Sequence, residues 1–154
     1  MKVGDTIEDF QLENQFAKTV TLTDTTKSYF VLFFYPKDNT PGCTIEAKAF
    51  SQLLDDFEKE DTIVIGISGG DTVSKQKFCD KQDLQVTLVS DTDYTYTKKL
   101  GLYTKKKFMG KEYMGIERTT VILDSQRIIL HIFDSVKPLG HAKEVLEWIK
   151  THKN

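Results

Sequence analysis

The feature that most constrains the fold is an almost uninterrupted apolar run at residues 28–35 (SYFVLFFY). Aromatic and β-branched residues in a run of this length favour a strand. Because the apolar residues do not alternate with polar ones, both faces of the strand must be covered, as in the middle of a sheet that has helices packed on it. We therefore expect residues 28–35 to form a central strand of an α/β domain.

The segments that follow alternate between helical and strand patterns. Residues 44–60 carry Ala47, Phe50, Leu54 and Phe57 at spacings of three and four, as one buried helical face requires. The spacing therefore predicts a long helix. Beyond it, we expect a buried strand at 62–68, a helix at 71–82 with Asp71 as its cap, a short strand at 86–89, a short helix at 94–100, and a loop with three glycines at 101–117.

The two ends of the chain complete the pattern. Residues 10–23 predict an N-terminal β-hairpin, and residues 119–124 and 127–133 flank a turn, as an antiparallel hairpin does. A last helix is expected to begin near Pro138, with a buried stripe made of Leu139, Ala142, Leu146 and Ile149. The fold expected is α/β and thioredoxin-like, a central mixed sheet flanked by helices with an N-terminal hairpin. No repeat or linker divides it, so residues 1–154 are predicted to be a single domain.

Charge and hydropathy exclude several classes of function. The formal net charge of -2 and the pI near 5.9 give little basis for binding a nucleic-acid backbone. The basic run 105–107 is interpreted as a solvated loop. No apolar run approaches the roughly 20 residues that span a bilayer, and the first residues do not resemble a signal peptide. We therefore expect no nucleic-acid or membrane partner and a cytoplasmic location.

Two cysteines are too few for a disulfide scaffold, so each must be considered as a reactive or an inert thiol. Cys43 follows the central strand and a loop with Pro36, Pro41 and Gly42, and the helix is expected to begin at or just after it. Free N–H groups at a helix start stabilise a thiolate, which is the nucleophilic form of cysteine. By this chemistry alone, an inert buried cysteine remains an equal alternative.

The residues around Cys43 favour the reactive reading. Pro36, Thr40 and Cys43 stand in the order Pro-x-x-x-Thr-x-x-Cys, and YPKDNTPGCTIE resembles the active-site segment of the peroxiredoxins, especially the Q-type group, the bacterioferritin comigratory proteins. The resemblance extends over essentially the whole chain. It implies that Cys43 is the peroxidatic cysteine, that Thr40 supplies a hydroxyl to peroxide and thiolate, and that Pro36 shields the pocket.

Two further residues are assigned by the same resemblance. Arg118 corresponds to the family's active-site arginine, whose permanent charge favours the thiolate and stabilises negative charge as the oxygen–oxygen bond breaks. Glu46 matches a glutamate that positions this arginine, although an acidic residue in a first helical turn is also favoured by the helix dipole. We therefore expect Glu46 to have a supporting role.

The resolving thiol is predicted to be Cys79. Many Q-type members carry this cysteine five residues after the peroxidatic one, but Lys48 occupies that position here. Cys79 lies in the predicted helix 71–82, as in a second Q-type subgroup. We expect Cys79 to be accessible at the surface, and the start of the Cys43 helix to unwind so that an intramolecular disulfide can form. If Cys79 is incidental instead, an external thiol resolves Cys43.

The reaction expected is reduction of a hydroperoxide by Cys43, giving a sulfenic acid and then a disulfide that thioredoxin or a similar dithiol reduces. We expect no metal or organic cofactor, because His131, His141 and His152 lack partners at ligand spacing. A monomer is implied by the resemblance. Position 46 is glutamate, so the Cys-x-x-Cys pair of a disulfide reductase is absent. A non-catalytic chaperone or binding protein on the same fold is the other alternative.

Overall fold

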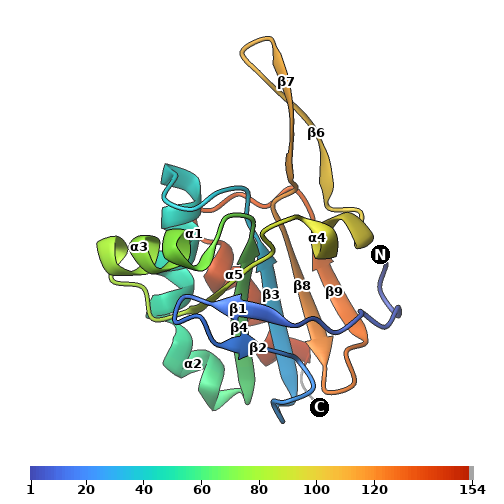
Figure 1. Ribbon diagram of the computed structural model, residues 1–154. Helices are drawn as coiled ribbons and strands as arrows, with labels where there is room; N and C mark the ends of the chain where they lie inside the picture. The colour runs from blue at the N-terminus through green and yellow to red at the C-terminus, as the bar shows by residue number, and fades with distance from the viewer. Residues whose placement is uncertain (153–154) are drawn as a thin grey trace.

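A seven-stranded mixed sheet forms the centre of the molecule in the computed structural model, which describes residues 1–152 (Figure 1). Its strands lie in the order β2-β1-β5-β4-β3-β8-β9. Strands β3, β4 and β5 are parallel, and the others join antiparallel. The strands are β1 (Leu12–Asn14), β2 (Thr19–Val20), β3 (Tyr29–Phe34), β4 (Thr62–Ser68), β5 (Thr87–Ser90), β8 (Thr119–Asp124) and β9 (Ile129–Phe133). The mixed sheet and the N-terminal hairpin are confirmed.

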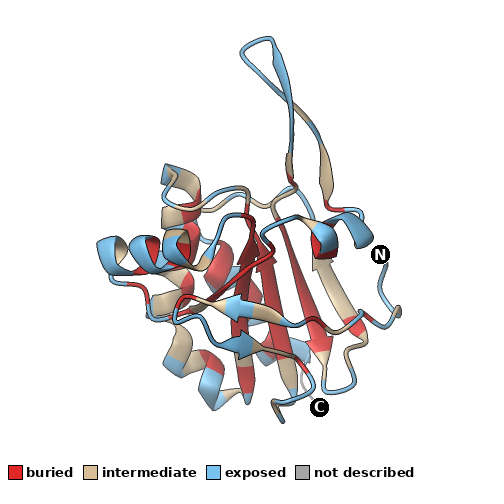
Figure 2. Cartoon of the chain, in the orientation of Figure 1, coloured by how far each residue is buried: buried red, intermediate tan, exposed pale blue. Residues whose placement is uncertain are grey.

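Helices cover both faces of this sheet, and the buried residues are concentrated in its central strands (Figure 2). Buried residues of α1, α2, α3 and α5 pack on one face, together with both cysteines. Helix α4 and the N-terminal segment contribute to the cluster on the other face. The helices are α1 (Pro41–Gln52), α2 (Leu54–Lys59), α3 (Thr72–Gln82), α4 (Thr95–Lys99) and α5 (His141–His152). Cys43 and Cys79 therefore lie on the same side of the sheet.

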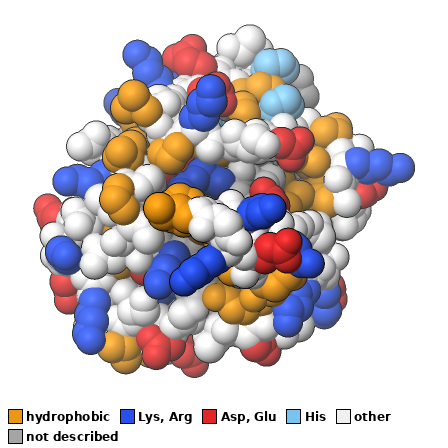
Figure 3. Space-filling view, turned by 90° about the horizontal axis from the view of Figure 1, so that it is seen from above, with side chains coloured by type: hydrophobic (Ala, Val, Ile, Leu, Met, Phe, Trp, Pro, Cys, Tyr) orange, Lys and Arg blue, Asp and Glu red, His pale blue; other side chains and the backbone are white. Residues whose placement is uncertain are grey.

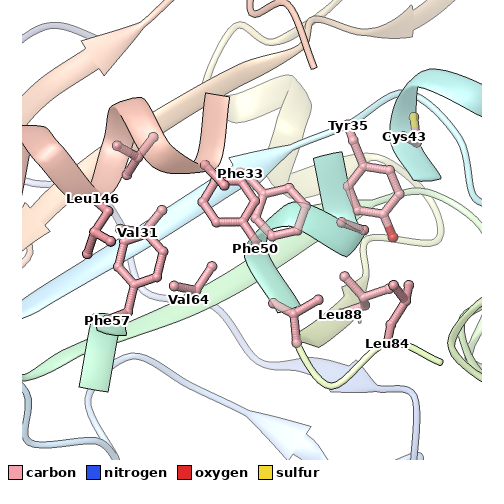
Figure 4. Close-up of a cluster of buried hydrophobic side chains, with 14 of the residues drawn as sticks. Val31, Phe33, Tyr35, Cys43, Phe50, Phe57, Val64, Leu84, Leu88 and Leu146 are labelled. Atoms are coloured by element: carbon pink, nitrogen blue, oxygen red, sulfur yellow. The ribbon is translucent and has the colours of Figure 1, made fainter. Parts of the chain in front are cut away.

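Strand β3 is central, as its composition predicts. Alternate side chains of the strand enter the two clusters: Val31 and Phe33 on the cysteine side, Leu32 and Phe34 on the other. The ring of Phe33 stacks on that of Phe50 from α1, with 4.5 Å between centroids, and Figure 4 shows this pair at the middle of the cluster. This packing fixes α1 against the strand that leads into it.

The prediction of a loop at residues 101–117 is wrong. Strands β6 (Tyr103–Phe108) and β7 (Lys111–Ile116) form a separate two-stranded ribbon that projects from the body (Figure 1). Its tip is a two-residue turn, Met109 and Gly110, with φ of 51° and 80°, which matches the twist of a hairpin. Toward the tip, both faces of the ribbon are exposed, so no alternation of apolar and polar residues marks these strands in the sequence.

Two helix boundaries also differ from the prediction. The long helix expected at 44–60 is divided at Leu53 into α1 and α2. The last helix begins at His141, because Gly140 has a φ of 79°, in the left-handed region that a right-handed helix cannot include. Leu139 therefore lies outside the helix and is 85% exposed, whereas Ala142, Leu146 and Ile149 are buried as predicted.

The surface carries both signs of charge. Viewed from above Figure 1, lysine and arginine side chains are interspersed with acidic and apolar ones (Figure 3). Within residues 1–152, no helix combines the length and the apolar character needed to cross a membrane.

Candidate active site

Cys43 lies where the central strand turns into its helix. Strand β3 ends at Phe34, the loop 35–40 follows, and α1 begins with Pro41 at its first position and Thr40 as its cap residue. Proline suits this place because its missing N–H would have no partner inside the helix. Cys43 is in the first turn of α1, where backbone N–H groups have no intrahelical acceptor. The structure thus places this thiol at a helix N-terminus.

Arg118 reaches Cys43 from a distant part of the sequence. It stands between β7 and β8, and its carbonyl accepts a hydrogen bond from the Val136 amide at 3.1 Å. The Nη2 atom of Arg118 donates to Cys43 Sγ at 3.4 Å, and its Nη1 donates to Glu46 Oε1 at 2.8 Å. One planar guanidinium therefore contacts both the thiol and the carboxylate, which the first turns of α1 hold side by side.

Gly42 leaves the space that the guanidinium occupies. A Cβ atom at this position would lie 3.2 Å from Arg118 Nη2 and 3.4 Å from Pro138 Cγ. Contacts this short would require the arginine to shift. The glycine that precedes Cys43 is therefore explained by the close approach of Arg118 to the first turn of α1.

The charge states of Arg118 and Glu46 follow from their burial and their contacts. Burial acts to lower the pKa of Arg118, but the negative charges of Cys43 and Glu46 raise it, and their effect prevails. For Glu46, burial raises the pKa to about 7, although Arg118 acts to lower it. The Oε2 atom of Glu46 is buried without a hydrogen-bond partner, which is consistent with a carboxyl that holds a proton near neutral pH. Arg118 thus stays cationic while Glu46 titrates.

Pro36 and Thr40 flank the thiol in the loop before α1. Pro36 directly follows the buried Tyr35 and is half-buried. The Thr40 hydroxyl donates to the Lys37 carbonyl at 3.0 Å in this structure. Cys43 is only 1% exposed beneath this loop, so a peroxide has to enter past it. The roles expected for Pro36 and Thr40 remain predictions.

Cys79 lies in α3, whose cap is confirmed: the Asp71 carboxylate accepts a hydrogen bond from the Ser74 amide at 2.8 Å. The prediction that Cys79 is accessible is wrong, because it is 7% exposed and packs with Phe78 in the cluster on the sheet. Burial, together with the charges of Asp38 and Asp80, raises the pKa of Cys79 to about 11. Cys43 and Cys79 are both free thiols in this structure.

A buried ion pair beside Cys79 was not predicted from the sequence. The Nζ atom of Lys75 lies 2.8 Å from Asp38 Oδ2, and the exposed fractions of the two side chains are 0% and 6%. A signal was available in the sequence, because Lys75, Phe78 and Cys79 stand at spacings of three and four on one face of α3. A lysine on the buried face of a helix needs a charged partner, which here comes from the loop before α1.

The three histidines contact a hydroxyl group or an aromatic ring. His141 is buried, and its Nε2 lies 2.7 Å from Thr120 Oγ1. His131 and His152 each stack on the Trp148 ring, with centroids 5.1 and 4.1 Å away. In the part of the chain that the structure describes, no group of three or more His, Cys, Asp or Glu side chains is arranged to hold a metal ion.

Comparisons with known proteins agree on one family. The AhpC/TSA family model matches residues 3–132. "Putative peroxiredoxin bcp" of Helicobacter pylori is 43% identical over 147 residues, which cover 96% of this chain and 97% of that protein. "Peroxiredoxin Bcp" of Escherichia coli K12 is 37% identical over 152 residues, 99% of this chain and 97% of that protein.

Solved structures show the same relationship. A PrxQ mutant from Xylella fastidiosa superposes with a TM-score of 0.93 at 36% identity, covering 100% of this chain and 98% of that one. Two cysteine-to-serine mutants of peroxiredoxin Q from Xanthomonas campestris match with TM-scores of 0.88 and 0.87 at 32% identity, covering 98% and 97% of this chain and 99% of each of those chains. The two cysteines replaced in that protein are 36 residues apart, the separation that Cys43 and Cys79 have here.

Proposed function

The chain belongs to the AhpC/TSA family and is a thiol peroxidase of the peroxiredoxin class, and from this premise we propose that Cys43 reduces hydroperoxides and that Cys79 resolves the oxidised sulfur. The observation that carries the proposal is the contact between Arg118 Nη2 and Cys43 Sγ at 3.4 Å. A guanidinium cannot lose its charge at neutral pH, so it favours the anionic form of the sulfur that it contacts.

In the first step, the Cys43 thiolate attacks one peroxide oxygen and the oxygen–oxygen bond breaks. The sulfur becomes a sulfenic acid, and the other oxygen leaves as hydroxide or alkoxide, which becomes water or an alcohol by taking up the equivalent of the proton that the thiol released to water on ionising. Negative charge develops on that departing oxygen in the transition state. Arg118 is already held by Glu46 at 2.8 Å, so it can stabilise this charge without first reorganising.

Thr40 and Pro36 lie in the loop that leads to Cys43, and we propose a role for each. The Thr40 hydroxyl bonds to the Lys37 carbonyl in this structure, and a change of rotamer would free it to bond a peroxide. Pro36 fixes the course of the chain as it leaves the buried end of β3. We infer that Thr40 orients the substrate and that Pro36 limits access of water.

Cys79 is proposed as the resolving cysteine because it is the second of two cysteines in the chain. Its separation from Cys43 equals that of the two cysteines substituted in the Xanthomonas campestris peroxiredoxin Q structures. Its thiol condenses with the Cys43 sulfenic acid, which releases water and forms one disulfide within the chain. A dithiol such as thioredoxin then reduces this disulfide. Because no second subunit has to contribute a thiol, we propose that the protein is a monomer. We also propose that it is cytoplasmic.

Thiol titration after one equivalent of hydrogen peroxide tests the proposal. The reduced protein should lose both thiols per chain and gain an intramolecular disulfide. Cys79→Ser should consume one equivalent and stop at a sulfenic acid that a dimedone-type reagent traps. Cys43→Ser, the matched control with the same loss of one sulfur, should consume none. Peroxide consumption at the wild-type rate by Cys43→Ser would exclude Cys43 as the reacting residue.

The alternative is a one-cysteine peroxidase that an external thiol resolves. The burial of Cys79 is the observation that favours this alternative, because a resolving thiol has to reach Cys43. The titration separates the two: a stable sulfenic acid in the wild-type protein, with Cys79 still free, would identify the one-cysteine mechanism.

A further inference from the structure

Four donors converge on the carboxylate of Asp38. Its Oδ1 accepts from the Tyr35 hydroxyl at 2.6 Å and from the Ser68 hydroxyl at 3.4 Å. Its Oδ2 accepts from the Ser74 hydroxyl at 2.7 Å and from Lys75 Nζ at 2.8 Å. Lys75 also donates to the Gly69 carbonyl. The ion pair is thus buried and hydrogen-bonded on both sides, the geometry that such a pair needs to be tolerated in a protein interior.

Asp38 and two of its donors, Ser74 and Lys75, come from the two segments that carry the cysteines. Asp38 lies in the loop that leads into α1, five residues before Cys43. Ser74 and Lys75 are in the first turn of α3, and Cys79 is one helical turn after Lys75. The network therefore ties the start of α1 to the start of α3 on the same side of the sheet.

Formation of a disulfide between Cys43 and Cys79 requires this tie to open. The Cα atoms of a disulfide lie about 4.4–6.8 Å apart, and both cysteines are here free and held in separate packed helices. Either the start of α1, with the loop before it, or helix α3, whose last turns carry Cys79, has to leave its place. Movement of the first carries Asp38 away from Lys75, and movement of the second carries Lys75 away from Asp38.

We propose that the Asp38–Lys75 ion pair, with Ser74, is a latch that gates the resolving step: while it is closed Cys79 is held away from Cys43, and its opening sets the rate of disulfide formation. The proposal rests on the proposed function of Cys79. The gated step is balanced: the Cys79 S–H bond and the Cys43 S–OH bond break, the S–S bond forms, and hydroxyl and proton leave as water. The oxidising equivalent is the one that the hydroperoxide delivered to Cys43.

The state of Cys79 fits a closed latch. Burial first, and then the charges of Asp38 and Asp80, raise the pKa of Cys79 to about 11 although Lys75 acts to lower it, so at neutral pH Cys79 is a protonated thiol and a weak nucleophile. Opening exposes this thiol to water and separates it from the buried carboxylate. Figure 4 shows Cys43 at the margin of the cluster beside Tyr35, the residue that donates to Asp38.

An ion pair is suited to this task for a physical reason. Separated charges regain their hydration, so opening the pair returns much of the cost of having buried it. An apolar contact of the same size would instead expose hydrophobic surface when it opened. The latch therefore fixes the closed geometry and still permits local opening.

The test uses rapid mixing of the full-length reduced protein with one equivalent of hydrogen peroxide, followed by acid quench and mass spectrometry of sulfenic acid and disulfide. Lys75→Met, which leaves Asp38 without its cation, should form the disulfide at least tenfold faster. Ser74→Ala, which removes one hydroxyl and no charge, should do so about two- to fivefold faster. Lys77→Met, at an exposed position of the same helix, is the matched control and should match the wild type.

Two further readouts separate gating from a general structural role. The rate constant of Cys43 with hydrogen peroxide should stay within about twofold in all three variants. The peroxide concentration that converts half of Cys43 to sulfinic acid should rise in proportion to the disulfide rate, because the two reactions compete for one sulfenic acid. If Lys75→Met fails to fold, as judged by circular dichroism, Ser74→Ala alone decides.

Disulfide formation at the wild-type rate or slower in the folded variants would overturn the latch while leaving Cys79 as the resolving residue. Absence of any disulfide between Cys43 and Cys79 in the wild type would overturn both the proposed resolving step and the latch.

Discussion

Replacement of Glu46 by glutamine should remove a pH-dependent loss of stability from the protein. The Glu46 carboxyl is buried in the first turns of α1, where one oxygen accepts from Arg118 and the other has no partner. Ionisation in this place is costly, even beside a guanidinium, and the pKa is raised to about 7 by burial. Glutamine keeps a carbonyl oxygen for Arg118 and carries no charge at any pH.

The magnitude follows from linkage between protonation and folding. The pKa of Glu46 changes from an ordinary value of 4.5 to about 7 on folding. At about 1.4 kcal/mol for each tenfold change in proton affinity, this difference corresponds to about 3 kcal/mol. Because the folded-state value is the higher one, this stability is fully present below about pH 4.5 and is lost as the pH rises through about 7. At pH 8, Glu46→Gln should therefore be more stable than the wild type by up to about 3 kcal/mol.

Urea unfolding of both proteins between pH 4.5 and 8, with a phosphine reductant present, measures this difference. The two free energies of unfolding should converge near pH 4.5 and diverge as the pH approaches 8. Glu147→Gln, the same chemical change at an exposed position of α5, is the control and should run parallel to the wild type. A difference between Glu46→Gln and the wild type that does not vary with pH would refute the reasoning, and so would a difference that shrinks as the pH rises.

Three further substitutions have defined outcomes. Arg118→Lys should lower the rate constant for the reaction with hydrogen peroxide about 100-fold, because an ammonium group cannot reproduce the two hydrogen bonds that the guanidinium makes to Cys43 and Glu46. Stopped-flow measurement of peroxide consumption tests this, and an unchanged rate would contradict the role of Arg118. Gly42→Ala places a methyl group 3.2 Å from Arg118 Nη2 and should lower the same rate about tenfold, at an unchanged melting temperature. Gly66→Ala places a Cβ 2.5 Å from Phe33 Cζ and should cost about 2 kcal/mol in urea unfolding, with wild-type stability as the contrary result.

The parts of the fold that were predicted from sequence are those in which local pattern and burial coincide. Residues 62–68 form β4 with the bounds that the apolar run predicts, because a strand covered on both faces is apolar along its whole length. The α3 cap was predicted because a short acidic side chain before a helix has one strong local use. The β6–β7 ribbon was missed since exposure on both faces leaves no periodicity to detect.

The features of the site also divide into those that a local sequence pattern predicts and those that it does not. The position of Cys43 follows from a strand that leads directly into a helix, which is a local feature. The burial of Cys79 does not follow from a local feature. Only Lys75 and Phe78 share its face of an otherwise polar helix, and a lysine is usually expected to be solvated, so the sequence does not mark this face as buried. That face packs on the sheet, and the partner of Lys75 is Asp38, 37 residues away in the sequence. The spacing in the sequence marks the face that Lys75 shares with Phe78 and Cys79, but only tertiary packing shows that the partner of Lys75 is Asp38.

The two cysteines have opposite electrostatic surroundings, and this difference assigns their proposed roles more firmly than their positions do. Cys43 Sγ is 3.4 Å from the guanidinium of Arg118, whereas the carboxylates of Asp38 and Asp80 act on Cys79, whose pKa burial has already raised, to about 11. At pH 7, a thiol with a pKa of about 11 is ionised in about one molecule in ten thousand. Cys79 therefore cannot compete with Cys43 for peroxide, as its proposed role as the resolving thiol requires. Reduced Cys43→Ser should accordingly react with hydrogen peroxide at least 1,000-fold more slowly than the wild type, because its remaining thiol, Cys79, is almost entirely protonated at pH 7.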